Sequence, residues 1–436
     1  MSLVQLLRHL RKSAVLRSVG WQILGSAATL GTALWISWSH SLEAQGEFGL
    51  IKSWFDAATA IGALGLPHGL LHLMYRRGIS AQQLLPWLRR ILTVAAILCL
   101  PTAIGAAAFG QQTPALIFAS LPFAIAHLLA RSWLLRERGE EIFGVITAMP
   151  ALVLLATVLL GGRHYAWLLL GTAVIAGTTS LTLVAHTVRQ ARAATGVKTS
   201  NAPKILPPPD LALVEKPPDA STTSLHRELW SSSLQIWMQA ALGSALPAGL
   251  LSVVAQSDQA QRALGEASLG LHVYQVFAVL AGYVAPLLFH RIADQKTSTR
   301  LDSLVLSTRS RQALWFLSAT LLLSMLVGLF LQPNALWPAI GLMSLAGVAA
   351  VAARLHSTVL LARSEYFELS LQAAWRLLLA LLAAVLALKL MPALVAVSAA
   401  LLLTEGLTWW RSARQVACVQ ATTLTCQPTH NKTDIR

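Results

Sequence analysis

Apolar runs long enough to cross a bilayer as helices recur along most of this chain. A membrane-spanning helix needs about 20 predominantly apolar residues. Runs of that length lie at about 18–39, 47–75, 91–109, 113–135, 141–160 and 165–188, and then at about 229–254, 267–290, 312–332, 335–361, 369–388 and 391–410. Only 12% of the residues are charged, whereas soluble domains carry roughly 25%. The sequence therefore predicts an all-α integral membrane protein with about twelve transmembrane helices.

A polar segment divides the apolar runs into two sets of six. It lies at 189–228 and holds the proline clusters Pro207–Pro209 and Pro217–Pro218, which cannot continue a helix. We expect a six-helix bundle at 1–188, a cytoplasmic linker at 189–228, a second six-helix bundle at 229–411 and a cytoplasmic tail at 412–436. Six spans per half predict parallel bundles, related by a pseudo-two-fold axis along the membrane normal, with a substrate site between them.

Basic residues gather in the loops of one side of the membrane. The net charge is +15, but the opposite loops hold chiefly Arg163, Arg262 and Lys389. Because Lys and Arg are enriched in cytoplasmic loops, the pattern places both termini in the cytoplasm. It also explains the net charge without a nucleic-acid partner, and we predict none.

Motifs for bond-making chemistry are absent from the sequence. The chain has no Gly-rich phosphate loop before a Lys-Ser/Thr pair and no nucleophile elbow. Its three cysteines, Cys99, Cys418 and Cys426, show neither disulfide nor metal-ligand spacing. Every predicted outer loop is short. We therefore predict movement of a substrate rather than catalysis, with no catalytic residue, metal site or cofactor.

The second predicted span carries a recognisable pattern. Gly46-Glu47-Phe48-Gly49-Leu50 begins it, and Leu64-Gly65-Leu66-Pro67 interrupts it before a basic turn. Together with residues 267–294, which hold Gly270-Leu271 and Pro286, this pattern resembles the Wzx-type polysaccharide flippases of the multidrug/oligosaccharidyl-lipid/polysaccharide exporter superfamily.

The resemblance implies a function. Such a protein flips an undecaprenyl-diphosphate-linked oligosaccharide across the bacterial inner membrane by alternating access, for surface or capsular polysaccharide biosynthesis. Its partners would be this substrate, membrane lipids, and polysaccharide polymerase and glycosyltransferases. Two alternatives stay open: a cation-coupled multidrug exporter, and a non-transporting component of a polysaccharide assembly complex.

The second span also holds two charges in its apolar run. Lys52 and Asp56 are spaced i, i+4 and share one helix face, where they can pair. One interpretation makes Lys52 a substrate contact and Asp56 an ion-coupling carboxylate. The other is a structural ion pair in which Lys52 extends to the outer interface.

The eleventh span carries a polar stripe at helical spacing: Glu365, Glu368, Gln372 and Arg376. A charge at mid-bilayer costs about 2.5–3.5 kcal/mol on insertion scales, so Arg376 must face protein or a wet cavity. Since guanidinium binds phosphate oxygens bidentately, we predict that Arg376, with Gln372, contacts the substrate diphosphate. The alternative is a buried pair with a carboxylate.

Glu405 in the twelfth span is the second candidate for ion coupling. A carboxylate there can exchange a proton or bind sodium as access alternates. The sequence leaves three pairings open: Asp56 with Arg376, Glu405 with Arg376, and Glu405 with Arg411.

Uncharged polar side chains line the seventh and eighth spans. Gln235 and Gln239 lie on one, and His272 and Gln275 on the other. Because amides can both donate and accept hydrogen bonds, we predict that these residues contact sugar hydroxyls. The alternative is that they join helices to one another.

Overall fold

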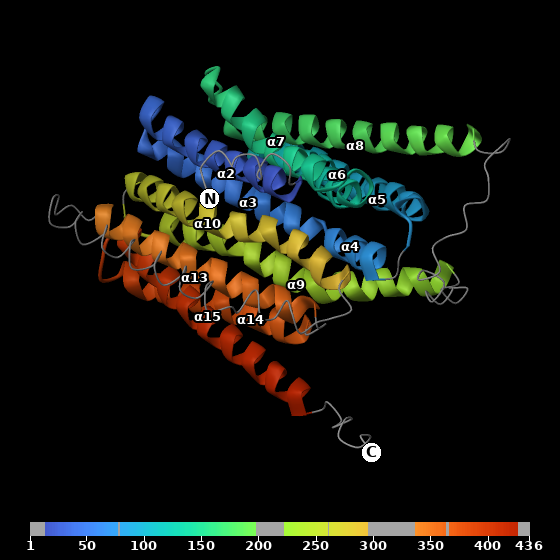
Figure 1. The fold of residues 1–436 in the computed structure, drawn as a ribbon. Helices are drawn as coiled ribbons and strands as arrows, with labels where there is room; N and C mark the ends of the chain where they lie inside the picture. The colour runs from blue at the N-terminus through green and yellow to red at the C-terminus, as the bar shows by residue number, and fades with distance from the viewer. Residues whose placement is uncertain are drawn as a thin grey trace, which may run out of the picture. The chain divides into compact units, whose positions relative to one another are not determined.

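The computed structural model describes residues 14–76, 79–197, 222–259, 261–294, 336–362 and 366–425, with some side chains inside these ranges left out. All regular structure in these ranges is α-helical (Figure 1). The helices are α2 (Ala14–Ser39), α3 (Leu42–Gly62), α4 (Leu66–Arg76), α5 (Ala81–Ala108), α6 (Gln112–Arg138), α7 (Glu140–Leu159), α8 (Tyr165–Val197), α9 (Thr222–Ala255), α10 (Gln261–Asp294), α13 (Leu336–Ala362), α14 (Tyr366–Leu388) and α15 (Ala393–Thr425).

The helices coincide with the predicted spans wherever the chain is described. Each predicted span has its helix except the one at about 312–332, which lies outside the described residues. Of the predicted linker, 189–197 belongs to α8 and 222–228 to α9, and 198–221 lies outside the described residues. Within the described ranges, eight helices are long and apolar enough to cross a membrane, and the bent pair α3–α4 makes a ninth. The predicted spans matched by α2 and α10 are not in that count. The protein is therefore a multi-pass, all-helical membrane protein.

The second span is broken where the sequence predicts an interruption. Helices α3 and α4 meet at an angle of 47°. Leu64 and Gly65 both have positive φ, 49° and 69°, a region in which a continuous helix is impossible. A Cβ at Gly65 would overlap the carbonyl oxygen of Ser233 on α9, so glycine is required for packing as well as for backbone conformation. Pro67 then falls in the first turn of α4, where proline is tolerated.

The chain forms two compact units, residues 1–272 and 273–436, which we describe separately. In the first unit α2 packs on α7, α6 on α5 and α8, and both α3 and α4 on α9. In the second unit α13 and α14 both pack on α15. The boundary between the units falls inside α10. The six-helix bundle limits at 188 and 229 stay a prediction.

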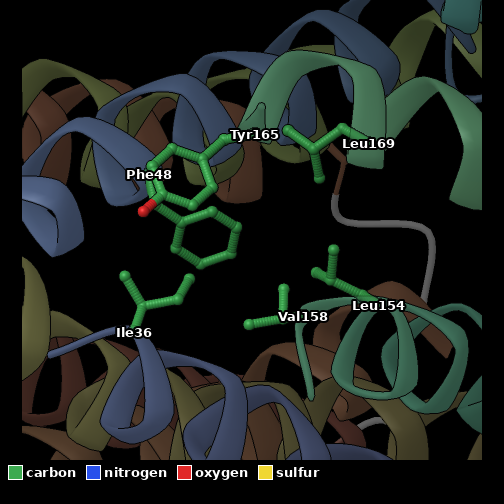
Figure 2. Close-up of a cluster of buried hydrophobic side chains, with 6 residues drawn as sticks. All are labelled: Ile36, Phe48, Leu154, Val158, Tyr165 and Leu169. Atoms are coloured by element: carbon green, nitrogen blue, oxygen red, sulfur yellow. The ribbon is translucent and has the colours of Figure 1, made fainter. Parts of the chain in front are cut away.

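The core of the first unit contains a cluster of six buried side chains from four helices (Figure 2). They are Ile36 of α2, Phe48 of α3, Leu154 and Val158 of α7, and Tyr165 and Leu169 of α8. The Phe48 and Tyr165 rings meet edge to face, with centroids 5.5 Å apart. This cluster packs α3 against α2, α7 and α8.

Helix α5 exposes apolar side chains, as a lipid-facing helix of a membrane protein does. The most apolar part of α5 is only 6% buried, and Val94, Ile97 and Ile104 are all more than half exposed. Such a surface suits contact with lipid chains.

Candidate functional site

A buried charged cluster joins three helices of the second unit. Arg376 of α14 lies 2.5 Å from Glu405 of α15, measured from Nη2 to Oε1, and its Nε donates to the same oxygen at 2.7 Å. The hydroxyl of Tyr274, on α10, donates to Glu405 Oε1 at 2.6 Å and accepts from Arg376 Nη2 at 2.6 Å. We call Tyr274, Arg376 and Glu405 the Arg376 cluster.

The two charged members of the Arg376 cluster differ in exposure, and a third charged side chain acts on the cluster. The Glu405 side chain is 1% exposed and that of Arg376 is 13% exposed. Arg354 of α13 is close enough for its charge to act on all three members. Among the described residues, the guanidinium groups of Arg354 and Arg376 thus both act on the Glu405 carboxylate.

These contacts distinguish between the pairings that the sequence leaves open. Arg376 pairs with Glu405 rather than with Asp56. Arg411, the other suggested partner of Glu405, lies 3.9 Å from Glu368 instead. Whether Arg376 also contacts substrate, and whether Glu405 binds a coupling ion, stay predictions.

The rest of the polar stripe on α14 faces α15. Gln372 donates to the carbonyl of Thr408 at 3.1 Å, and Glu368 accepts from Gln415 at 2.7 Å. Glu365 lies outside the described residues. The stripe is therefore at least partly a packing surface between two helices, whatever else Gln372 contacts.

The charged pair of the first unit lies within one helix. Lys52 Nζ is 2.5 Å from Asp56 Oδ2, one turn apart on α3, with side chains 17% and 43% exposed. This is the pair that the i, i+4 spacing predicts. The roles of Lys52 in substrate binding and of Asp56 in ion coupling stay predictions.

Glycines let α3 and α10 approach closely. A Cβ at Gly265 would overlap the carbonyl oxygen of Leu42, and one at Gly49 would overlap the hydroxyl of Ser268. A Cβ at Gly46 would lie 2.9 Å from the nitrogen of Gly265. Gly46 is thus explained by a backbone-to-backbone contact, and Gly49 by the close approach of the Ser268 side chain.

Polar side chains meet at this crossing of α3 and α10. Gln45 Nε2 donates to Ser268 Oγ at 3.2 Å, and that hydroxyl lies 3.3 Å from the carbonyl of Gln45. His272 Nδ1 lies 2.7 Å from the carbonyl of Ser268. The His272 ring stacks on Phe48, with centroids 6.2 Å apart. We call Gln45, Ser268 and His272 the α3–α10 site.

The three remaining predicted glutamines lie on α9 and α10. Gln239 of α9 and Gln275 of α10 are half-buried. Gln235 lies on α9, but its side chain is outside the described part of the structure. Their contacts with a sugar stay predictions.

Sequence reasoning missed Tyr274 and Gln45. Tyr274 is a polar aromatic residue inside an apolar run, and it lies two positions from His272, so the helix carries both on different faces. Gln45 directly precedes the first glycine of the second-span pattern. A search for buried polar residues beside close-packing glycines would have found Gln45.

Solved structures share this fold over nearly the whole chain. A MATE multidrug transporter, DinF-BH, matches with a TM-score of 0.63 and 15% identity, covering 94% of this chain and 95% of that chain. An inward-facing and an outward-facing conformation of a multidrug resistance MATE family transporter of the MOP superfamily match with TM-scores of 0.59 and 0.60. Their identities are 13% and 12%, covering 92% and 94% of this chain and 96% of each transporter.

These likenesses concern the fold, because the sequence identities are low. No protein-family model and no curated protein matches the chain in sequence. The expected fold class is confirmed: the chain has the all-helical fold of MATE transporters, with two repeated halves.

Proposed function

We propose that this protein is an exporter that works by alternating access. The proposal is carried by the likeness to both an inward-facing and an outward-facing MATE transporter, over 92% or more of this chain. A fold that occurs in both states suits a protein that opens to the two membrane faces in turn. Since the sequence contains no nucleotide-binding loop, an ion gradient or consumption of the substrate on the far side would supply the energy.

The first candidate substrates are amphipathic organic compounds. The structures that share the fold are described as multidrug transporters. On this proposal the chain belongs to the MOP superfamily and has the activity that our sequence interpretation placed second.

A specific observation favours a second candidate, the flipping of a lipid-linked oligosaccharide that carries a diphosphate. Exporters of cationic drugs would be expected to offer unpaired carboxylates. Here Asp56 and Glu405 are each engaged with a cation, and a second guanidinium, that of Arg354, also acts on the Arg376 cluster. A diphosphate fits that charge better than a cation does.

The Arg376 cluster suggests how a diphosphate would be bound. Guanidinium forms the same forked hydrogen bonds with phosphate as with carboxylate. A phosphate that binds Arg376 therefore competes with Glu405 for the guanidinium. Gln372, Lys52, Gln235, Gln239 and Gln275 remain proposed contacts for the head group.

The two candidates are separated by expressing the protein in cells that lack their own multidrug exporters, and by deleting its gene in its own host. An exporter of drugs lowers susceptibility to cationic aromatic compounds when expressed. A flippase leaves susceptibility unchanged, whereas its deletion makes lipid-linked saccharide accumulate on the inner leaflet. If neither result is obtained, and polymerase subunits co-purify with the protein, a non-transporting assembly component replaces both candidates.

The same assays test Arg376. We expect Arg376→Ala to abolish transport and Arg376→Lys to retain part of it, because lysine keeps the charge but not the fork. Expression must be matched by quantitative blotting. Full transport by Arg376→Ala would remove this residue from the site.

Placement in the cell follows from the same proposal. We propose a bacterial inner membrane location with both termini cytoplasmic, where the basic loops place them. The flippase candidate also implies work beside a polysaccharide polymerase and glycosyltransferases. Cysteines introduced by Ser2→Cys and Asp434→Cys test the orientation of both ends, through their accessibility to a reagent that does not cross the membrane.

A further inference from the structure

Two buried hydrogen-bond acceptors without partners lie in the α3–α10 site. Among the described residues, neither Gln45 Oε1 nor His272 Nε2 has a hydrogen-bond partner. Gln45 is 0% and His272 4% exposed. A buried polar atom left unpaired costs about 1–3 kcal/mol, so two of them in one helix crossing call for a ligand that can donate.

The contacts with Ser268 determine which atoms are acceptors. A carbonyl oxygen only accepts, so His272 Nδ1, which lies 2.7 Å from the Ser268 carbonyl, carries the ring hydrogen. In the neutral ring Nε2 is then a lone-pair acceptor. Gln45 Nε2 donates to Ser268 Oγ, which leaves Gln45 Oε1 as the second acceptor.

A single proton resolves this mismatch. Two acceptors cannot bond to each other, but protonated Nε2 is a donor. The imidazolium ring keeps its bond from Nδ1 to the Ser268 carbonyl, and its Nε2–H becomes a donor in a site whose other unpartnered atom, Gln45 Oε1, is an acceptor.

The charged groups around His272 do not oppose a proton strongly. Among the described residues, Lys52 and Asp56 of α3 are the charges that act on the ring, and they act in opposite directions. Because they pair with each other, their effects largely cancel. Protonation of the ring is therefore decided by its burial and its local hydrogen bonds, and not by these two charges.

A metal cation fits the same atoms less well. Hard cations such as sodium prefer oxygen ligands, whereas an imidazole nitrogen suits zinc or copper. In the described ranges, no group of three His, Cys, Asp or Glu side chains is placed to hold a metal ion. A proton is the species that suits one imidazole nitrogen beside one amide oxygen.

We propose that Gln45, Ser268 and His272 form a proton-binding site, in which the proton binds to Nε2 of His272. The binding itself stands on these contacts alone; its use in driving export rests on the proposed transport function. The site is distinct from both carboxylates, Asp56 and Glu405, which the sequence made candidates for ion coupling.

The test is nitrogen NMR of the full chain, with ¹⁵N-labelled histidine, in lipid nanodiscs. Loss of a signal in His272→Asn assigns the residue. At high pH we expect the neutral ring protonated on Nδ1, and between about pH 9 and 4 we expect conversion to imidazolium. A ring that stays neutral throughout, or that carries its hydrogen on Nε2, overturns the proposal.

Variants of the acceptor sharpen the test in both directions. Gln45→Leu removes the acceptor and should lower the proton affinity of His272 about tenfold, whereas Gln45→Glu should raise it. The matched control is Gln22→Leu, because Gln22 is also fully buried in the first unit, bonds a serine and has an unpartnered Oε1. Equal shifts in Gln45→Leu and Gln22→Leu would refute a specific role for Gln45.

Two further measurements complete the test. One distinguishes proton binding from sodium binding, and the other distinguishes failure of the proton site from failure of the transport function. Sodium chloride is exchanged for choline chloride at constant pH and ionic strength; a His272 signal that follows sodium and not pH makes this a cation site and overturns the proton. The NMR titration needs no substrate. A protein that titrates at His272 but exports nothing therefore disproves the transport function and leaves the proton site standing.

Discussion

The charged pairs Lys52–Asp56 and Arg376–Glu405 differ in what they connect. Lys52 and Asp56 lie one turn apart on the same helix, and Asp56 is 43% exposed. Arg376 and Glu405 lie on different helices, and Glu405 is 1% exposed. The first pair depends on one helix being formed, whereas the second depends on the packing of three. We therefore expect the second pair to affect both stability and transport strongly, and the first pair to contribute little to stability.

The largest effect is expected when one partner of the Arg376 cluster is removed. Glu405→Ala leaves a buried guanidinium without its carboxylate, and breaking a buried pair in this way costs about 3–5 kcal/mol. Unfolding of the purified protein in nanodiscs, followed by heat or denaturant, measures the loss. Arg411→Ala is the control, because Arg411 is 41% exposed and lies 3.9 Å from Glu368; a comparable loss there would contradict the comparison.

Removing both charges separates stability from transport. Replacing Arg376 and Glu405 together by Met and Leu leaves no buried charge, and such replacements are often neutral or stabilising. We expect the double variant to unfold close to wild type yet to be inactive in export. An active double variant would show that the cluster is structural only.

The hydroxyl of Tyr274 gives a smaller effect in the same cluster. Tyr274→Phe keeps the ring but removes bonds to both Arg376 and Glu405. Hydrogen bonds to charged groups contribute about 1.5–3 kcal/mol, so the unfolding free energy should fall by that amount. Tyr165→Phe is the control: the hydroxyl of Tyr165 lies 3.0 Å from Nδ1 of His40, so its loss breaks a bond to one residue and should cost less in the same unfolding measurement.

The sequence predicted the helices of this fold better than the contacts between them. Apolar run length located every span that the structure describes, and Gly65 and Pro67 marked the break between α3 and α4. The i, i+4 pairing of Lys52 with Asp56 was also predictable, because a helix fixes that spacing. The partner of Arg376 was not, since Glu405 is 29 residues away and three pairings were equally compatible with the sequence.

The α3–α10 site was out of reach of sequence reasoning for the same reason. Gln45 and Ser268 are separated by 223 residues, and only the folded chain brings them into contact. His272 was predicted as a sugar contact from its residue type. That role and a proton-binding role are indistinguishable until the bond to the Ser268 carbonyl fixes which nitrogen is protonated.

In the first unit, close backbone packing rather than charge holds α3. Gly265→Ala forces α10 away from the Leu42 carbonyl, and overpacking of this kind costs about 1–3 kcal/mol. Gly20→Ala is the control, because nothing lies within 4 Å of a Cβ at that position. There, alanine should stabilise α2 by roughly 0.5–1 kcal/mol. Differential scanning fluorimetry of both variants tests the contrast, and a stable Gly265→Ala protein would disprove the tight crossing.

The smallest effect is expected for the pair within α3. An i, i+4 ion pair contributes about 0.3–0.5 kcal/mol, so Lys52→Met and Asp56→Asn should each change the unfolding free energy by no more than about that amount. Because Lys52 and Asp56 act on His272 in opposite directions, the two variants should move its titration midpoint oppositely: upward when the lysine charge is lost and downward when the carboxylate charge is lost. The measurements are the unfolding and NMR experiments above. A loss of stability as large as that of Glu405→Ala would mean that this pair, too, supports tertiary structure, and the contrast between the two pairs would then not hold.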